Sequence, residues 1–380
     1  MINVFQPSVG QEELDAVGRV FERSWLGPGR ECEEFEHEFA DYLHMYAENL
    51  VLVNSCTSAI YLGLRALGVG PRDEVILPTI HFIGALNAIL ELGAIPILAD
   101  VDTRTLNILP DEIERLISPR TKAVFVLHYG GHPCDVAAIR EILGNTDHDI
   151  FWIEDAAGAV ASKYCGNACG TLGDLGVWSL DSMKMLMMGD GGFLWALDSG
   201  VAERVRRLRN LGLSRYSGMS AMNAMQSRWW EFEVVEPSGL FLSNDLQAAI
   251  GREQLRKVAD FLARRCMVWN IYDERLSEAP ITLPPIPGLA SGDTAGSYYL
   301  YWIQTKTGYD RDNLARHLLE AGIYTTFRYW PLHRAYPSLD RDFANADRVA
   351  AITLNLPCHN GLTDDNVNYI CDKILEYFGT

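Results

Sequence analysis

The sequence predicts an α/β protein: a mainly parallel sheet with helices on both faces, followed by a smaller α+β domain. Two observations support this fold class. Short apolar runs alternate with helical patterns from about residue 50 to about residue 200. The runs lack polar positions, which is typical of strands in a parallel sheet covered on both faces. Beyond about residue 240 the alternation stops, which indicates a second unit.

Seven apolar runs are expected to form the sheet. The run that begins at Glu74 is stopped by Pro78, and the helix after the first run should end near Gly68. The expected strands are Leu50–Val53, Glu74–Leu77, Ile95–Ala99, Ala123–Leu127, Phe151–Ile153, Gly176–Ser179 and Gly192–Ala196. The helices expected among them are Thr57–Leu67, His81–Leu92 and one that begins near Asp135.

The remaining chain has a different pattern. It predicts a long helix, a proline-rich stretch, an aromatic strand and a further helix, namely Asn244–Ala263, Leu283–Pro287, Tyr298–Ile303 and Asp312–Ala321. We therefore expect a large domain over residues 1–250 and a small domain over residues 251–380.

Composition excludes several classes of function. The 380 residues carry a formal net charge of -18 with no basic block, which argues against a nucleic-acid partner. No signal peptide opens the chain, and no run of about 18 apolar residues predicts a membrane span. Of the eight cysteines only Cys165 and Cys169 form a close pair, so we expect no metal site, reduced thiols and a cytoplasmic protein. His128 and His132 have a metal-like spacing, but the glycines between them disfavour a helix, and we interpret both as loop residues.

Lys184 is the basic residue of an otherwise apolar or small stretch that ends in a glycine cluster. Burial lowers the pKa of an amine and makes it nucleophilic, as a Schiff-base lysine requires. Upstream, an apolar run ends at Glu154 and Asp155. A lysine for an aldehyde and an acid for a ring nitrogen together suggest pyridoxal phosphate. The alternative for Lys184 is a surface lysine with an apolar stem.

The stretch Asn54–Ser58 follows the first strand and opens a helix. Ligands of parallel sheets bind at the carboxyl ends of strands, and a helix N-terminus suits a phosphate. By itself the stretch predicts no more than a helix cap.

Several motifs in this order resemble the DegT–StrS family of sugar aminotransferases, which are fold-type-I enzymes that use pyridoxal phosphate. The resemblance covers nearly the whole chain. The segments that carry it are Gly27–Gly29, Phe35–Ala40, Asn54–Ile60, Gly68–Pro78, His128–Asp135, Glu154–Ala157, Gly170–Gly176 with Ser179 and Lys184, Tyr329–His333 and Leu356–Pro357.

The resemblance implies a role for individual residues. Lys184 would form the Schiff base and move protons, and Asp155 would hold the ring nitrogen protonated. The remaining implied contacts are Phe82 on the ring face, Cys56, Thr57 and Ser179 at the phosphate, and Gly29, Arg328 and His333 at the substrate. Without the resemblance, Phe82 would be interpreted as a core aromatic and Ser179 as a polar strand end.

Some positions depart from the family pattern. Gly158 stands where many members have a glutamine near the cofactor's phenolic oxygen, His81 replaces a threonine, and Cys56 replaces a glycine. Leu240 stands where an asparagine or lysine of the neighbouring subunit reaches the phosphate. A basic residue such as Arg228 of the partner is a candidate to replace that contact.

The resemblance implies transfer of an amino group from glutamate to a keto sugar, which we expect to be nucleotide-linked, in amino-sugar or surface-polysaccharide biosynthesis. It also implies a homodimer with shared active sites, for which Trp229–Phe232 is a candidate interface. Two alternatives stay open. One is a glutamine-dependent aminotransferase of a keto-cyclitol, distinguished around Arg328 and Arg215–Trp230. The other is a pyridoxal-phosphate-binding regulatory or structural protein without turnover.

Overall fold

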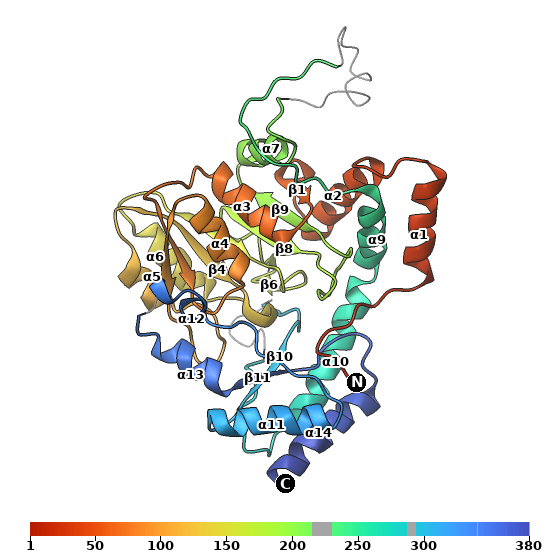
Figure 1. Cartoon of the computed structure of the whole chain (residues 1–380), viewed down its shortest axis with the longest axis vertical. Coiled ribbons are helices and arrows are strands. Elements are labelled where there is room, and N and C mark those ends of the chain that lie inside the picture. The colour runs from red at the N-terminus through yellow and green to blue at the C-terminus, as the bar shows by residue number, and fades with distance from the viewer. Residues whose placement is uncertain (215–229, 287–293, 340, 380) are drawn as a thin grey trace.

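The structure is a computed structural model that describes residues 1–214, 230–286, 294–339 and 341–379. A seven-stranded sheet in the order β1-β9-β8-β5-β4-β2-β3 forms its centre (Figure 1). The strands are β1 (Leu50–Val53), β2 (Glu74–Pro78), β3 (Ile95–Ala99), β4 (Thr121–Leu127), β5 (Phe151–Asp155), β8 (Leu175–Ser179) and β9 (Gly192–Ala196). β9 is antiparallel to both of its neighbours, and the other pairs in this sheet are parallel. The predicted mainly parallel sheet is therefore confirmed.

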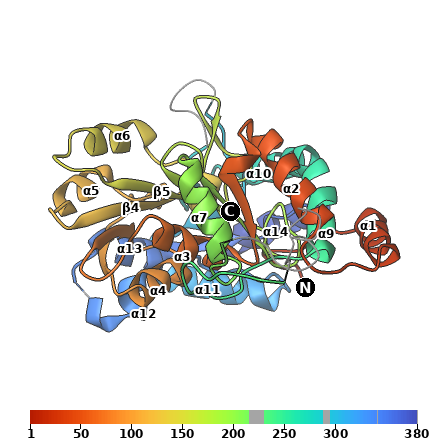
Figure 2. The ribbon, with the colours of Figure 1, turned by 90° about the horizontal axis from the view of Figure 1, so that it is seen from above.

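Successive residues of the strands point into different cores, because side chains alternate between the faces of a sheet. Val51 and Val53 of β1 belong to one core cluster, whereas Leu50 and Leu52 belong to another. Helices supply the other side of each cluster, as the view from above shows (Figure 2). On one face lie α3 (Cys56–Ala66), α4 (Ile83–Glu91) and α7 (Ser199–Leu208). On the other lie α2 (Arg30–Leu43), α5 (Pro110–Leu116), α6 (Val136–Gly144) and α9 (Asp245–Arg256).

The C-terminal region has a small sheet of its own. Strands β10 (Tyr301–Gln304) and β11 (Thr353–Leu356) pair in antiparallel fashion. The helices of this region are α10 (Val258–Arg275), α11 (Gly308–Glu320), α12 (Leu332–Ala335), α13 (Ala344–Ile352) and α14 (Asp364–Phe378). This is the predicted α+β arrangement, although one apolar cluster continues from the large sheet into it. The boundary at residue 250 stays a prediction.

Two expectations about this region are wrong in detail. The helix predicted over Asn244–Ala263 is divided into α9 and α10, which meet at Lys257. α9 packs against α1 (Gln11–Glu22) and α2, whereas α10 packs against α14. The predicted aromatic strand begins only at Tyr301, because Tyr298 has a φ of 53°.

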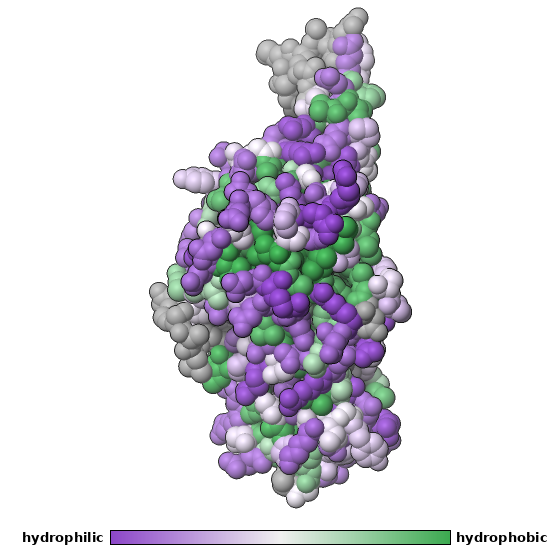
Figure 3. All heavy atoms as spheres, turned by 90° about the vertical axis from the view of Figure 1, so that its left-hand side faces the viewer, coloured by the Kyte–Doolittle hydropathy of each residue, from purple (hydrophilic) through white to green (hydrophobic). Residues whose placement is uncertain are grey.

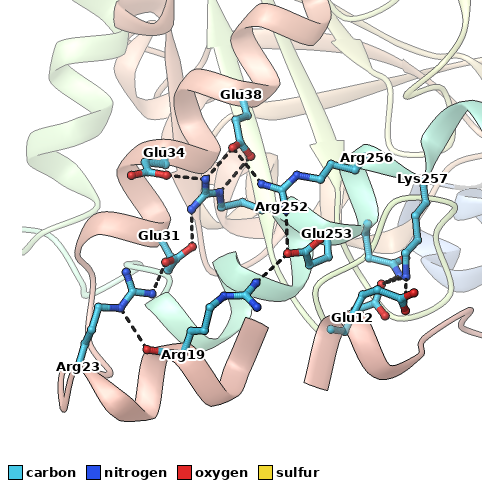
Figure 4. A network of polar contacts seen from close by, with 12 residues as sticks. Glu12, Arg19, Arg23, Glu31, Glu34, Glu38, Arg252, Glu253, Arg256 and Lys257 are labelled. Carbon is cyan, nitrogen blue, oxygen red and sulfur yellow. Dashed lines mark hydrogen bonds and ion pairs between the residues drawn. The ribbon is translucent and has the colours of Figure 1, made fainter. Parts of the chain in front are cut away.

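An ion-pair cluster joins α1, α2 and α9 (Figure 4). Its centre is Arg252 of α9, which is 2.5 Å from Glu31 Oε2 and 2.6 Å from Glu38 Oε1. Its other members are Glu34, Arg19, Arg23, Glu253 and Arg256. Arg252 donates hydrogen bonds to Glu38 and Glu31, and these bonds raise the pKa of Arg252, so it keeps its positive charge between the helices.

Two antiparallel segments project from the body beside α7 (Figure 1). They pair through bridges between Asn210 and Leu240 and between Leu213 and Val234. Residues 215–229 lie outside the described residues. The predicted stretch Arg215–Trp230, except for Trp230, is therefore not described, and this includes Arg228 and Trp229. None of the helices in the described ranges is long and apolar enough to cross a membrane.

Candidate active site

Two of the predicted site residues, Asp155 and Ser179, lie at one edge of the sheet, where the parallel strands end. β5 ends at Asp155 and β8 ends at Ser179. β9 runs in the opposite direction, so its first residue, Gly192, lies at the same edge and pairs with Ser179 and with Val53. The topology therefore gathers residues that are more than a hundred positions apart.

Asp155 is almost completely buried. Its Oδ1 accepts a hydrogen bond of 2.8 Å from the Ala157 N–H. Its Oδ2 is 3.5 Å from Nε2 of His81, a contact too long for a good hydrogen bond. The carboxylate is thus fixed through one oxygen, and the other can accept a further donor.

Lys184 lies in the connection between β8 and β9. This connection is closed by backbone hydrogen bonds from Leu180 N–H to Gly191 O and from Lys184 N–H to Asp181 O, each 2.9 Å long. The Lys184 ammonium is 4.8 Å from the centre of the Tyr299 ring. The lysine is therefore held on a hairpin that is anchored in the sheet at both ends.

The charge of Lys184 is not what its apolar neighbours suggested. Burial disfavours the ammonium, but Tyr299, Tyr329 and Asp155 favour it, and together they raise the pKa of Lys184 above its ordinary value. The prediction that burial lowers the pKa of Lys184 is therefore wrong for the polypeptide without its cofactor. The physical reason is that the Asp155 carboxylate and the rings of Tyr299 and Tyr329 lie near the ammonium.

The start of α3 is a candidate anion site. Ser55 is the N-cap, and its Oγ accepts the Ser58 N–H at 3.1 Å. The N–H groups of Cys56 and Thr57 occupy the first helical positions, which have no acceptor within the helix. A Cβ at Gly192 would lie 2.6 Å from the Cys56 nitrogen, so only glycine lets β9 approach this turn. Burial raises the pKa of the Cys56 thiol, and Asp155 raises it further, which keeps this side chain neutral.

Phe82 caps α4 and is 45% exposed. This exposure excludes the interpretation of Phe82 as a core aromatic. Its ring lies 6.0 Å from the Tyr329 ring, centre to centre, in an edge contact. Tyr329 is also close enough to Lys184 to affect its pKa. Phe82 therefore lies at the border of the lysine site, and part of its ring surface is exposed.

Arg328 comes to the site from the C-terminal region. Its guanidinium lies 4.3 Å from the centre of the Phe5 ring, and Nη2 is 3.1 Å from Sδ of Met183. Met183 is the residue before Lys184. The predicted substrate contact Arg328 is therefore brought to the lysine, together with the N-terminal residue Phe5.

The other two predicted substrate contacts are not brought to the lysine. His333 is completely buried, with Nδ1 2.7 Å from Thr79 Oγ1 and Nε2 3.0 Å from Asp347 Oδ1. Because both ring nitrogens have protein partners, neither is available to bind a substrate, which argues against the predicted substrate contact of His333. Gly29 caps α2, and a Cβ there would meet Asp245 and Trp25 at 2.9 Å. Among the described contacts, none joins Gly29 to Lys184.

The sequence reasoning missed the role of Glu154. Its Oε2 is 2.8 Å from Nε2 of His128 and accepts the Gly170 N–H, and its Oε1 accepts the N–H groups of Leu172 and Gly173. The carboxylate thus ties the loop before β8 to the end of β5. His128 and His132 are loop residues as predicted, and no group of three potential ligands for a metal occurs in the described part of the chain.

Comparison with known proteins agrees with this geometry. The model of the DegT/DnrJ/EryC1/StrS aminotransferase family matches residues 7–375. The chain belongs to this family.

Relatives within the DegT/DnrJ/EryC1/StrS family match over nearly the whole chain. A dTDP-4-dehydro-2,3,6-trideoxy-D-glucose 4-aminotransferase of Saccharopolyspora spinosa is 43% identical over 98% of this chain and 96% of its own length. A GDP-perosamine synthase of Escherichia coli O157:H7 is 30% identical over 99% of this chain and 98% of its own. The crystal structure of the aminotransferase TlmJ from Streptoalloteichus hindustanus has a TM-score of 0.92 at 44% identity and covers 100% of this chain and 99% of that one.

Membership makes this chain an aminotransferase that uses pyridoxal phosphate. The residues at the sheet edge fit that cofactor. An anion site at the start of α3 suits a phosphate, a buried carboxylate with one oxygen available suits a protonated ring nitrogen, and Phe82 offers an open ring face. Lys184 lies among these groups.

Proposed function

We propose that this aminotransferase transfers an amino group from glutamate to the 4-keto group of a nucleotide-linked deoxysugar. The observation that supports it most is that Lys184, Asp155 and the α3 anion site share one sheet edge in a chain 43% identical to a dTDP-sugar 4-aminotransferase. The GDP-perosamine synthase relative supports a nucleotide-linked sugar rather than a cyclitol.

Pyridoxal phosphate supplies an aldehyde for amines and a ring that withdraws electrons from the carbon bonded to the amine. Each residue at the sheet edge has a proposed task toward it. Lys184 holds the cofactor through its amine and carries protons to and from the reacting carbon. Asp155 keeps a negative charge at the ring nitrogen. Phe82 covers the ring face.

The phosphate is assigned to the start of α3. The N–H groups of Cys56 and Thr57 and the hydroxyls of Thr57 and Ser179 would hold it. A helix end contributes only about half a positive charge, so the hydroxyls are needed for a doubly charged group. The side chain of Leu240 has no hydrogen-bond donor that a partner chain could add to the phosphate.

Arg328 is the proposed contact for a substrate carboxylate or sugar oxygen. A guanidinium can bind a carboxylate with two parallel hydrogen bonds, as recognition of glutamate requires. Its contacts with Phe5 and Met183 leave it beside the lysine without a carboxylate partner in the described ion pairs. Gly29 stays a prediction as a sugar contact.

A homodimer with shared active sites is also proposed. Apolar side chains on the projecting segments are exposed, with Phe232 at 65%. The others are Leu211, Trp230, Val234, Val235 and Leu240. Figure 3 shows apolar side chains near the top of the molecule, next to the grey segment, as well as in a band across its middle. Apolar patches of this kind are typical of protein interfaces, and a twofold pair is the usual closed arrangement. A cytoplasmic location likewise stays a prediction.

Turnover tests the proposal directly. The protein, loaded with pyridoxal phosphate, is given glutamate with an isotope-labelled amino nitrogen and a dTDP-linked 4-keto-deoxysugar. We expect the label in the sugar product by mass spectrometry and no product from Lys184→Ala. Glutamine as donor and a GDP-linked 4-keto sugar are the informative comparisons.

Two results would contradict the proposal. The sugar assignment fails if no nucleotide-linked keto sugar takes up the label while another acceptor does. The lysine assignment fails if borohydride reduction fixes the cofactor to Lys163 instead of Lys184.

A further inference from the structure

Gly158 and Tyr299 occupy one space beside the reactive lysine. A Cβ at position 158 would lie 2.6 Å from Cδ1 of Tyr299, closer than a real Cβ can approach. Position 158 therefore has no room for a side chain while Tyr299 keeps its place. The missing side chain at 158, a departure from the family pattern, is matched by a tyrosine from the C-terminal region.

Tyr299 is fixed through both its backbone and its ring. Its backbone N–H donates to Gly130 O at 3.1 Å, and its carbonyl accepts Arg265 Nη1 at 3.2 Å. Phe5 stacks on it at 5.8 Å, centre to centre. The Tyr299 side chain therefore has little freedom to rotate toward another hydrogen-bond partner.

The hydroxyl of Tyr299 is buried and has no hydrogen-bond partner among the described residues. A buried hydroxyl without a partner is unfavourable, so the site should provide one when it is complete. The ring lies 4.8 Å from Nζ of Lys184, the atom that bonds the cofactor in the proposed function. The cofactor's phenolic oxygen is attached to the carbon next to the one that carries its aldehyde, and so lies near that nitrogen.

We propose that the Tyr299 hydroxyl donates a hydrogen bond to the phenolic oxygen of pyridoxal phosphate, and that Gly158 is required to make room for it. This inference rests on the proposed role of Lys184. The hydrogen bond stabilises negative charge on the phenolic oxygen. That oxygen then holds the proton of the lysine link less strongly, and the link loses its proton at lower pH.

The pH dependence of the bound cofactor's visible absorption tests this role. Tyr299→Phe keeps the ring over Lys184 and removes only the hydroxyl. We expect the midpoint of the absorption change to rise by about one pH unit, a tenfold change in proton affinity. Tyr301→Phe is the matched control, because its buried hydroxyl bonds Asp273 at 2.7 Å instead of facing Lys184, and its midpoint should stay that of the parent.

A second pair of variants guards against a general disturbance of the site. Tyr299→Ala should raise the midpoint, and adding Gly158→Gln, which fits only once the ring is gone, should lower it again by restoring a donor. An unchanged midpoint in Tyr299→Phe overturns the inference and leaves the proposed function intact. A parent protein whose Lys184 takes up no cofactor overturns both.

Discussion

The imidazole of His81 lies against the carboxylate of Asp155, with Nε2 3.5 Å from Oδ2 and both side chains buried. The other ring nitrogen of His81 is 3.1 Å from the Phe82 carbonyl, which can only accept, so Nδ1 carries the hydrogen. Burial lowers the pKa of His81, although Asp155 opposes this. A neutral His81 thus gives Oδ2 no donor, and the carboxylate stays available for the cofactor's ring nitrogen.

Asp155→Asn is expected to reduce turnover by at least about two orders of magnitude, roughly 2.7 kcal/mol in the barrier, because an amide cannot hold the ring nitrogen protonated. Steady-state kinetics on the loaded enzyme measures this. His81→Thr, which restores the residue usual in the family, is the control and should lose much less. Near-normal activity of the Asn variant would show that Asp155 does not face the ring nitrogen.

Thr57→Val should weaken cofactor binding by about 1.5–3 kcal/mol, the range for a hydrogen bond to a charged group. Leu240→Asn should leave the affinity unchanged or increase it, because it adds a donor where the chain has none. Both affinities follow from titration of the cofactor-free protein with pyridoxal phosphate. A Thr57→Val protein that binds like the parent would place the phosphate elsewhere.

Arg252→Met is expected to lower the free energy of unfolding by about 1–3 kcal/mol, because it leaves the partly buried carboxylates of Glu31 and Glu38 without their shared donor. Denaturant titration measures the change. Arg30→Met removes an exposed pair with Glu34 and should change stability by less than about 1 kcal/mol. Equal effects of the two variants would show that the ion-pair cluster does not hold α9 against α2.

Protonation of His132 is expected to lower the free energy of unfolding in acid. Burial, together with His128, lowers its pKa from 6.5 to about 4. The unfolded chain therefore takes up the proton first, so this contribution is present above about pH 6.5 and is lost as the pH falls toward 4. Unfolding midpoints in urea at several pH values should fall less steeply for His132→Asn than for the parent. Identical slopes would exclude His132 as a source of the acid sensitivity.

Phe232→Asp should weaken self-association, because it places a charge on an exposed apolar side chain of the projecting segments. Sedimentation velocity over a range of concentrations would detect the shift toward monomer. Leu197→Asp, at an exposed apolar residue after β9, is the control on the body of the protein. An active monomer of the parent at working concentration would refute the shared-site homodimer.

The seven strands were predictable because each apolar run alternates between two cores and is bounded by turn residues. The helix break at Lys257 was not, because the sequence from Asn244 to Ala263 keeps helical residues throughout. Only the different partners of α9 and α10 separate the two helices. Tyr298 shows the same limit, since its φ of 53° is not a local preference of tyrosine and could not be predicted from the sequence.

Lys184 and Asp155 stood out in the sequence because charge in an apolar run is unfavourable without a use. Tyr299 did not stand out. It lies in an aromatic stretch whose composition indicates a strand, and its relation to Gly158 spans more than a hundred residues. The contacts of His81 and Phe5 could not be predicted either, because they exist only once the chain has folded. The motif Tyr329–His333 carries the resemblance to the family, but it could not indicate that the His333 side chain is buried.

The groups around Lys184 enter the polypeptide at very different times during synthesis. The phosphate turn at Cys56 and the lysine itself emerge early, whereas Tyr299, Arg328 and Tyr329 emerge only after the whole sheet has been made. A nascent chain that has reached β9 therefore has Lys184 and Asp155 but lacks the three side chains that the C-terminal region adds beside the lysine. The site therefore receives its last side chains only when the ribosome has passed these late residues.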